Sequence, residues 1–296
     1  MPSFLEERAN LGGRVAIVTG GAGGLGLPIT LDLARAGVAV AVCDRDPEAV
    51  SAVTAQLADL GVAPVVRCFD VRDSEELAAF FDEVDRELGR LDILVNVPGG
   101  SYRSPLLDMS RKGTDAVIRQ NFTYVVEAAQ LAVRRMEAQG TGGSIVNITS
   151  IEGHRAMPAM GVYGAMKAAV AHLTMTLAVE LGPIGVRVNA VAPDLFPTPA
   201  TRGPGWSMAD ELGPLHELQN SITVPLGRKG IGSDLSGCVL FLASDLAAYV
   251  TGTTLHVDGG TMAAGGWSRW PDGYDNLIPE QVLVKAMEPD GEAAPD

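Results

Sequence analysis

The stretch RVAIVTGGAGGLG, residues 14–26, decides the fold of this chain. Its first six residues form a short, largely apolar run, which is typical of a strand buried on both faces. The glycines that follow permit a tight turn, and a helical pattern begins at Leu25. A helix that starts there presents free N–H groups and the positive end of its dipole, which suits a pyrophosphate. A merely flexible turn is the alternative, but the position directly after a strand favours dinucleotide binding.

Further apolar runs recur along the chain, separated by segments with helical periodicity. The expected strands are Arg14–Thr19, Val38–Cys43, Pro64–Phe69, Asp92–Asn96, Ser144–Thr149, Val186–Val191 and Thr253–Val257. The expected helices include Leu25–Ala36, Pro47–Leu60, Ser74–Leu88, Thr114–Gln139, Ala159–Leu181 and Ser233–Ala243. Alternation of strand and helix is typical of right-handed βαβ units. The sequence therefore predicts an α/β, Rossmann-type fold with a doubly wound parallel sheet of seven strands.

Two segments depart from this alternation. Residues 194–225 are rich in proline yet carry large apolar side chains, and we expect a substrate lid with a short helix around Met208–Gln219. Residues 261–296 follow the last strand and end in the acidic stretch EPDGEAAPD, so their last residues are expected to be disordered. We therefore predict one domain over residues 1–260 and a C-terminal extension over 261–296.

Composition excludes several classes of protein. The formal net charge of −14 works against binding of a nucleic-acid backbone, and 47% hydrophobic residues are enough for a large core. The beginning of the chain has no basic segment followed by an apolar one, and no long uninterrupted apolar run occurs, so neither export nor a membrane span is expected. Cys43, Cys68 and Cys238 lack metal-ligand spacing, which favours a reducing cytoplasm and no metal site.

Ser150, Tyr163 and Lys167 form the candidate reaction centre. Ser150 ends the fifth expected strand, and Tyr163 and Lys167 lie one helical turn apart on the next helix. A nearby ammonium group favours the phenolate form of a tyrosine, which suits proton transfer to or from an alcohol oxygen. Ser150 can donate a hydrogen bond to that oxygen. Each residue has a structural alternative: a packing aromatic, a solvated charge and a helix cap.

Asp44 is the candidate selector of the cofactor. It follows the second expected strand, where a carboxylate can accept hydrogen bonds from both hydroxyls of the adenosine ribose and repel a 2′-phosphate. The adjacent Arg45 weakens this argument, and Asp44 could instead cap the next helix. On balance the pattern favours NAD over NADP.

Residues 12–260 resemble the short-chain dehydrogenase/reductase family in the motifs TGGAGGLG and YGAMK and in the VDGG at residues 257–260. The resemblance implies a catalytic tetrad of Asn121, Ser150, Tyr163 and Lys167, in which Asn121 kinks its helix and holds a water of the proton relay. It also implies cofactor contacts from a larger set: Gly20, Gly24, Leu25, Gly26, Asp44, Arg45, Asp70, Val71, Asn96, Gly99, Tyr163, Lys167, Pro193 and Thr198.

Three stretches depart from the family pattern. Val97-Pro98 replaces the usual Asn-Ala after the fourth strand, which leaves the backbone shape beside the cofactor open. Asp194 replaces a glycine after the sixth strand and is expected to alter the loop rather than the chemistry. Residues 152–155, Glu-Gly-His-Arg, are unusually polar for a segment near the substrate. One of these side chains could face the pocket, although an exposed loop position is the favoured interpretation for His154.

The resemblance implies an NAD(H)-dependent oxidoreductase that interconverts a secondary alcohol and a ketone, with Tyr163 as acid and base. A dehydratase or epimerase with the same cofactor and a catalytically idle NAD-binding protein are the alternatives. Ser150, Glu152, Phe196 and Trp206 are the candidate pocket residues, and Trp267, Trp270 and Tyr274 in the extension could cover a bulky apolar, cyclic or aryl substrate. These three aromatics could equally pin the tail to the surface or to a partner subunit. A homotetramer or homodimer follows by family analogy.

Overall fold

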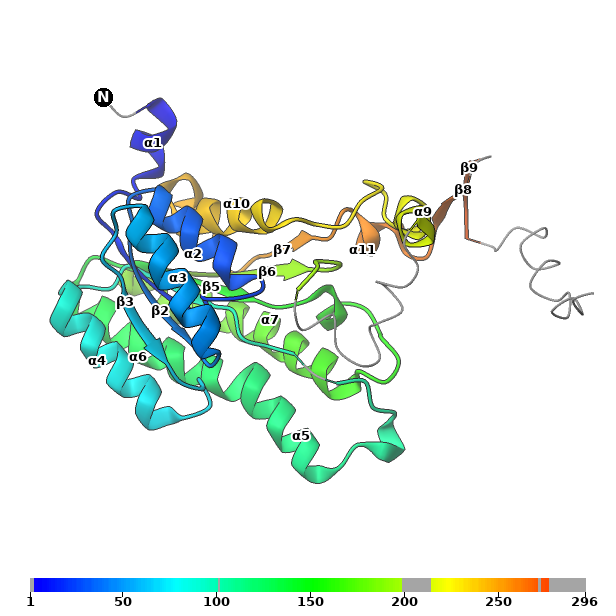
Figure 1. Ribbon diagram of the computed structural model, residues 1–296, viewed down its shortest axis with the longest axis horizontal. Coiled ribbons are helices and arrows are strands. Elements are labelled where there is room, and N and C mark those ends of the chain that lie inside the picture. Colours follow the sequence, from blue (N-terminus) through cyan, green and yellow to red (C-terminus); the bar gives the residue numbers. More distant parts are fainter. Residues whose placement is uncertain (1–2, 101, 199–213, 271–272, 277–296) are drawn as a thin grey trace, which may run out of the picture.

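Seven parallel strands form the centre of the protein, in the order β3-β2-β1-β4-β5-β6-β7 (Figure 1). This computed structural model describes residues 3–100, 102–198, 214–270 and 273–276. It confirms the predicted α/β fold. The strands are β1 Val15–Thr19, β2 Ala39–Asp44, β3 Val65–Cys68, β4 Ile93–Asn96, β5 Gly143–Ile148, β6 Val186–Pro193 and β7 Thr254–Val257.

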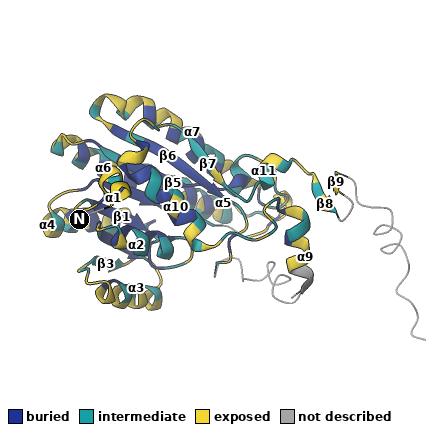
Figure 2. Ribbon diagram, turned by 90° about the horizontal axis from the view of Figure 1, so that it is seen from above, coloured by how far each residue is buried: buried dark blue, intermediate teal, exposed yellow. Residues whose placement is uncertain are grey.

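Helices cover both faces of the sheet, so the inner strands are mostly coloured as buried in Figure 2, whereas the edge strands β3 and β7 are only partly buried. Helices α2, α3 and α10 pack on one face and α4, α6 and α7 on the other (Figure 1). The main helices are α2 Gly26–Arg35, α3 Pro47–Asp59, α4 Ser74–Leu88, α5 Arg111–Ile118, α6 Tyr124–Gln139, α7 Gly161–Leu181, α9 Pro214–Thr223 and α10 Gly232–Ala243. Shorter elements are α1 Phe4–Ala9, η1 Leu106–Asp108, η3 Ile151–Gly153, η4 Gly182–Ile184, η6 Asp245–Ala247 and α11 Thr261–Ala264.

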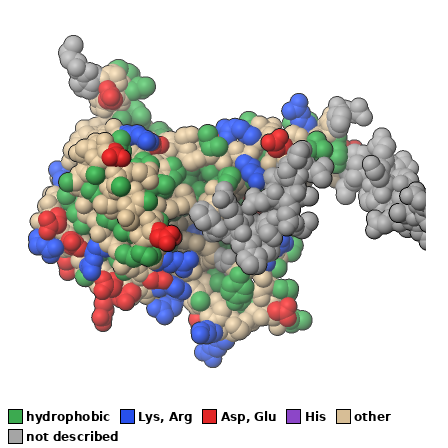
Figure 3. Space-filling view, in the orientation of Figure 1, with side chains coloured by type: hydrophobic (Ala, Val, Ile, Leu, Met, Phe, Trp, Pro, Cys, Tyr) green, Lys and Arg blue, Asp and Glu red, His purple; other side chains and the backbone are tan. Residues whose placement is uncertain are grey.

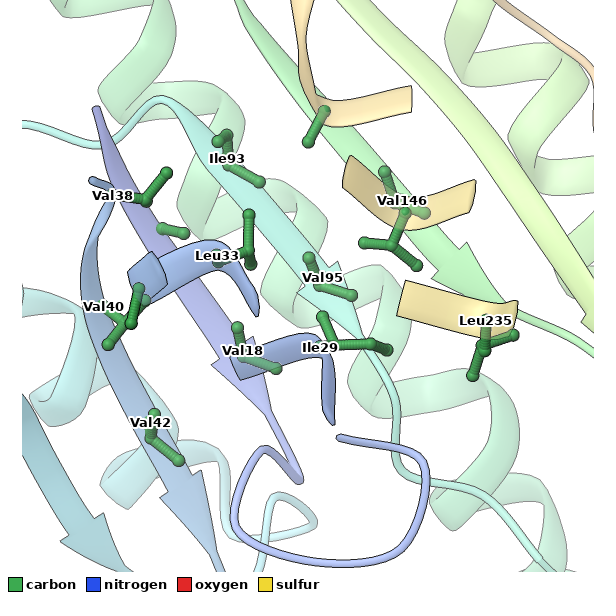
Figure 4. Close-up of a cluster of buried hydrophobic side chains, with 14 of the residues drawn as sticks. Val18, Ile29, Leu33, Val38, Val40, Val42, Ile93, Val95, Val146 and Leu235 are labelled. Atoms are coloured by element: carbon green, nitrogen blue, oxygen red, sulfur yellow. The ribbon is translucent and has the colours of Figure 1, made fainter. Parts of the chain in front are cut away.

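The packing of α2 on the sheet fixes the glycine-rich turn. Ile29 and Leu33 of α2 lie against Val18 of β1 and Val95 of β4, and all four are fully buried (Figure 4). Burial of a side chain of this size contributes about 1.5–3 kcal/mol each. The start of α2 is therefore held above the point where the strand order reverses, between β1 and β4.

The long helix expected over residues 114–139 is interrupted. It begins earlier, at Arg111, and a π-helical turn η2, Arg119–Thr123, separates α5 from α6. Such a turn holds one extra residue and usually lies at a functional position. Helix α7 starts two residues later than expected, because Ala159 adopts a φ of 64°, which is incompatible with an α-helix.

The lid and the extension differ most from expectation. The described part of the helix expected around Met208–Gln219 is α9, Pro214–Thr223, while Met208–Gly213 lie outside the described residues. The extension forms an antiparallel hairpin, β8 Ser268–Trp270 and β9 Gly273–Asp275, which the sequence does not predict. Strand β8 lies beside α9 (Figure 1). The disorder expected for the last residues falls outside the described part of the chain.

Acidic and basic side chains are interspersed on the face shown in Figure 3. Helix α7 together with η4, Gly161–Ile184, is long and apolar enough to span a membrane by length and composition alone. It packs against β6 on one face of the sheet.

Candidate active site

The glycine-rich turn fits a pyrophosphate. Gly20 and Gly24 have φ of 61° and 49°, and a side chain on Gly26 would overlap the carbonyl group of Gly20. The hydroxyl of Thr30 in α2 donates to the Gly21 carbonyl at 2.8 Å and locks the turn onto the helix. Leu25 precedes α2 and provides no side-chain cap, and the N–H groups of Gly26 and Leu27 donate to the Gly23 carbonyl at 2.9 and 3.2 Å.

Asp44 lies at the carboxyl end of β2, beside this turn. Its Oδ2 accepts a hydrogen bond from the Ala22 N–H at 3.3 Å, and its Oδ1 accepts one from the Asp46 N–H at 3.2 Å. Asp46, not Asp44, caps helix α3 through the N–H groups of Glu48 and Ala49. The capping alternative for Asp44 is therefore wrong.

Asp70, another expected cofactor contact, is held by its own neighbour. Arg72 donates to both carboxylate oxygens of Asp70, and this hydrogen bonding lowers the pKa of Asp70 below its usual value. Arg45 is exposed and adds a smaller electrostatic effect in the same direction. Val71 is buried in the core beneath α4.

The loop after β4 is built around Pro98 and Gly99. A Cβ on Gly20 would lie 2.8 Å from Pro98 Cγ, so the substituted proline packs directly on the glycine-rich turn. Tyr124 donates its hydroxyl to the Pro98 carbonyl at 2.7 Å. Asn96 is buried within the sheet, where its amide donates to Asn147 Oδ1 at 2.9 Å. The unusual sequence thus keeps an ordered loop beside the turn.

Asn121 occupies the π turn and ties it to the same loop. Its Nδ2 donates to the carbonyls of Gly100 at 2.9 Å and Val117 at 2.8 Å, and its Oδ1 accepts from the Gly100 N–H at 3.0 Å. A Cβ on Gly99 would lie 2.6 Å from Lys167 Nζ and 3.0 Å from Asn121 Oδ1. The helix irregularity expected at Asn121 is present, and Asn121 and Lys167 both lie beside Gly99.

Ser150, Tyr163 and Lys167 come together at the carboxyl end of β5. The Lys167 ammonium lies 5.8 Å from the centre of the Tyr163 ring and donates to the Ile148 carbonyl at 2.9 Å. Burial lowers the pKa of Lys167 to about 8. Burial also raises the pKa of Tyr163, the hydrogen bond with Ser150 lowers it, and the Glu152 carboxylate adds a smaller rise. The hydrogen bond from Ser150 therefore favours the phenolate form of Tyr163.

A polar wall borders this centre. Arg155 Nη2 donates to Glu152 Oε1 at 2.9 Å and to Asp194 Oδ1 at 3.1 Å, and Thr261 donates to Asp194 Oδ2 at 2.6 Å. Burial raises the pKa of Asp194, while Thr261 and Arg155 oppose that rise. Asp194 therefore anchors the loop after β6 to Arg155 and Thr261. Sequence reasoning missed the roles of Arg155 and Thr261, because no local pattern links positions so far apart in the chain.

His154 is not the exposed loop residue that the sequence favoured. It is half-buried, and its ring lies 4.7 Å, centre to centre, from the ring of His256 in β7. Burial, and to a smaller extent His256, lower the pKa of His154. The residue therefore fills the space between η3 and β7.

The remaining predicted residues are divided between the turn and the core. Thr198 lies beside Gly24, with its Cβ 3.8 Å from the position that a Gly24 side chain would take. Pro193 is buried at the end of β6. Phe196, expected in the substrate pocket, instead belongs to the hydrophobic core, where its ring packs on Gly230. Trp206 lies outside the described residues.

The assembled site therefore has two halves along the carboxyl edge of the sheet. The turn, Asp44 and Thr198 form a cradle shaped for a dinucleotide. Ser150 and Tyr163 place two hydroxyl groups next to a buried ammonium, an arrangement that can hold an alcohol oxygen and exchange a proton with it.

Comparisons with known proteins agree with this geometry. A family model described as enoyl-(acyl carrier protein) reductase matches residues 20–262. A cyclohexanol dehydrogenase of Rhodococcus sp. (strain TK6) is 37% identical over 274 residues, which cover 86% of this chain and 98% of that protein.

Two solved structures superpose closely on this chain. A short-chain type dehydrogenase/reductase from Mycobacterium marinum has a TM-score of 0.77 and 34% identity, and covers 88% of this chain and 99% of its own. A gluconate 5-dehydrogenase from Burkholderia cenocepacia J2315, in complex with NADP and tartrate, also has a TM-score of 0.77 and 34% identity. It covers 88% of this chain and 99% of its own.

Proposed function

This chain belongs to the short-chain dehydrogenase/reductase family, and we propose that it is an NAD(H)-dependent enzyme that interconverts a secondary alcohol and a ketone. Members of this family that resemble the chain are oxidoreductases, and the chain is an oxidoreductase that acts on alcohol or ketone substrates. The observation that carries the proposal is the grouping of Ser150, Tyr163 and Lys167 at the sheet edge that also carries the glycine-rich turn.

Each residue has a distinct role in the proposed reaction. Ser150 holds the substrate oxygen, and Tyr163 takes the hydroxyl proton during oxidation or returns it during reduction. A bound NAD⁺ would supply the hydride acceptor for the oxidation, and its positive charge would favour the Tyr163 phenolate. Lys167 holds the nicotinamide ribose and keeps a positive charge near Tyr163, while Asn121 anchors the proton relay behind Lys167.

The preference for NAD rests on Asp44. Its carboxylate lies where the ribose of the adenosine is expected, and a 2′-phosphate there would meet like charge. The relative crystallised with NADP makes the opposite preference the principal alternative. Arg45, exposed next to Asp44, is the side chain that could support it.

For the substrate we propose a bulky apolar ring. The Rhodococcus relative is named for cyclohexanol, and an aromatic-rich hairpin stands beside α9 of the proposed lid. We also propose a cytoplasmic homo-oligomer, a tetramer or dimer. Met175 and Val179 on α7 are 47% and 80% exposed. Exposed apolar side chains on one long helix could be buried against the same helix of a second copy of the chain.

The test is oxidation of a panel of cyclic and aryl alcohols, followed by NADH absorbance, with Tyr163→Phe as the variant. Because general acid–base catalysis contributes about 10²- to 10⁴-fold, the variant should lose kcat by that factor and still bind NADH. A variant that keeps more than roughly a tenth of the wild-type rate contradicts the role of Tyr163. Conversion without net NADH formation favours a dehydratase or epimerase, and NADH binding without turnover favours an idle protein.

A further inference from the structure

Glu152 carries a buried oxygen that nothing in the described structure satisfies. Its Oε1 accepts hydrogen bonds from Arg155 at 2.9 and 3.3 Å, whereas Oε2 is inaccessible to solvent and has no hydrogen-bond partner among the described residues. Its side chain is only 11% exposed. A buried charged oxygen without a donor is unfavourable, so a rotation of the carboxylate that brought Oε2 to a substrate hydroxyl group would be favoured, and the hydroxyl would be bound strongly.

The polar side chains next to Glu152 form hydrogen bonds and ion pairs with one another. Arg155 is shared between Glu152 and Asp194, and the second oxygen of Asp194 accepts from Thr261 at 2.6 Å. Two carboxylates therefore face a single guanidinium group, which leaves excess negative charge on this wall. No described residue donates to Glu152 Oε2, so a donor on the substrate can take this place, and an anion is disfavoured there.

Glu152 stands next to the reacting groups. Its backbone N–H donates to Ser150 Oγ at 3.2 Å, and its carbonyl oxygen lies 2.8 Å from the position that a Gly164 Cβ would take. Element η3 therefore packs on the first turn of α7, which carries Tyr163. The effect of the Glu152 carboxylate on the pKa of Tyr163 agrees with this proximity.

We propose that Glu152 is a specificity-determining residue whose free oxygen accepts a hydrogen bond from a second hydroxyl group of the substrate. The pocket then selects a cyclic diol over the corresponding mono-alcohol and disfavours a hydroxy acid. This inference rests on the proposed alcohol oxidation. The hydroxyl bound to Glu152 is unchanged, while the other carbinol loses its hydride to NAD⁺ and its proton to Tyr163, so the product is a hydroxyketone.

The kinetic test compares kcat/KM for cyclohexanediols, cyclohexanol and a hydroxycyclohexanecarboxylate, with whichever of NAD⁺ or NADP⁺ binds more tightly. A hydrogen bond to a charged acceptor corresponds to about ten- to a hundredfold, so the wild type should prefer at least one diol over cyclohexanol by this factor. The carboxylate substrate should be the poorest of the three.

Three variants separate the hydrogen bond from the charge. Glu152→Ala should abolish the diol preference and relax the exclusion of the carboxylate. Glu152→Gln keeps an acceptor oxygen and removes the charge, so it should retain part of the diol preference while the carboxylate is tolerated. In both variants the pH profile of kcat/KM should move to lower pH, because a negative charge next to Tyr163 is gone. The matched control is Glu137→Gln, an exposed position on α6 that should change none of these ratios.

Binding without turnover distinguishes failure of this inference from failure of the proposed function. Calorimetric titration of the alcohols into the Tyr163→Phe protein loaded with cofactor should show diol binding about tenfold or more tighter than cyclohexanol, and Glu152→Ala in that background should remove the difference. Equal binding of diol and cyclohexanol, or a difference that survives Glu152→Ala, overturns the inference even if the enzyme oxidises alcohols. Selective diol binding with no oxidation of any alcohol supports the role of Glu152 and contradicts the proposed function.

Discussion

The Asp44 carboxylate accepts hydrogen bonds from two backbone N–H groups. The contribution of its charge to cofactor binding can therefore be measured separately from its contribution to the geometry of the turn. Asp44→Ala should weaken NADH binding about tenfold or more and narrow the preference over NADPH, since a charge-assisted hydrogen bond contributes about 1.5–3 kcal/mol. Asp44→Asn keeps an oxygen for the Ala22 N–H and is the control for turn geometry. Fluorescence titration of both cofactors gives the affinities. Tighter binding of NADPH than of NADH by the wild type would contradict the assignment.

Lys167 makes the stability of the protein depend on pH. Because burial lowers its pKa to about 8 in the folded chain, from 10.5 when unfolded, the folded state releases this proton first. Raising the pH from 8 to 10.5 should therefore stabilise the wild type relative to Lys167→Met, by about 3 kcal/mol at most. Thermal unfolding of both proteins at pH 7, 9 and 10 measures this difference. A difference that does not change with pH would mean that Lys167 titrates normally.

At the scale of elements, substitution by alanine should have opposite effects on stability at two glycines that lie in helices. Gly237 in α10 is exposed and a Cβ there would meet nothing within 4 Å, so Gly237→Ala should stabilise the protein by about 0.5–1 kcal/mol through reduced chain entropy. Gly26→Ala in α2 places a methyl group on the Gly20 carbonyl and should destabilise the turn and reduce NADH affinity. Chemical denaturation and cofactor titration distinguish the two. Equal effects of the two substitutions would contradict this account of the turn.

The sequence predicts the sheet well because parallel strands covered on both faces are continuous apolar runs. The ends of the strands differ from the predicted ends by one or two residues, because hydrogen bonding, and not hydrophobicity, decides where a strand ends. Asp44 still belongs to β2 because it pairs with Cys68 of β3, and β5 ends two residues before Ser150. The kink of the helix at Asn121 follows from the family resemblance, but not from periodicity. The link from Arg155 to Asp194 spans 39 residues and requires the folded chain.

At the scale of the whole molecule, α11 and the hairpin can be removed separately. A chain that ends at Gly266 keeps Thr261 and its hydrogen bond to Asp194 but lacks Trp267, Trp270 and Tyr274. If these aromatics cover the substrate, this chain should show a raised KM for the alcohol with unchanged NADH affinity. A chain that ends at Gly260 also loses the Thr261 anchor and should be affected more. Unchanged KM in the chain ending at Gly266, or loss of assembly alone, would indicate that the aromatics serve only to attach the tail.

The two ends of the described chain differ in how they connect to the site. Helix α1 has no buried residue and lies at the opposite end of the molecule from the hairpin (Figure 1). Thr261, at the start of the extension, reaches Glu152 through Asp194 and Arg155. A resin, electrode or fusion partner attached at the N-terminus should therefore leave substrate selection unchanged. The same attachment at the C-terminus should alter substrate selection, because it loads the extension that begins at Thr261.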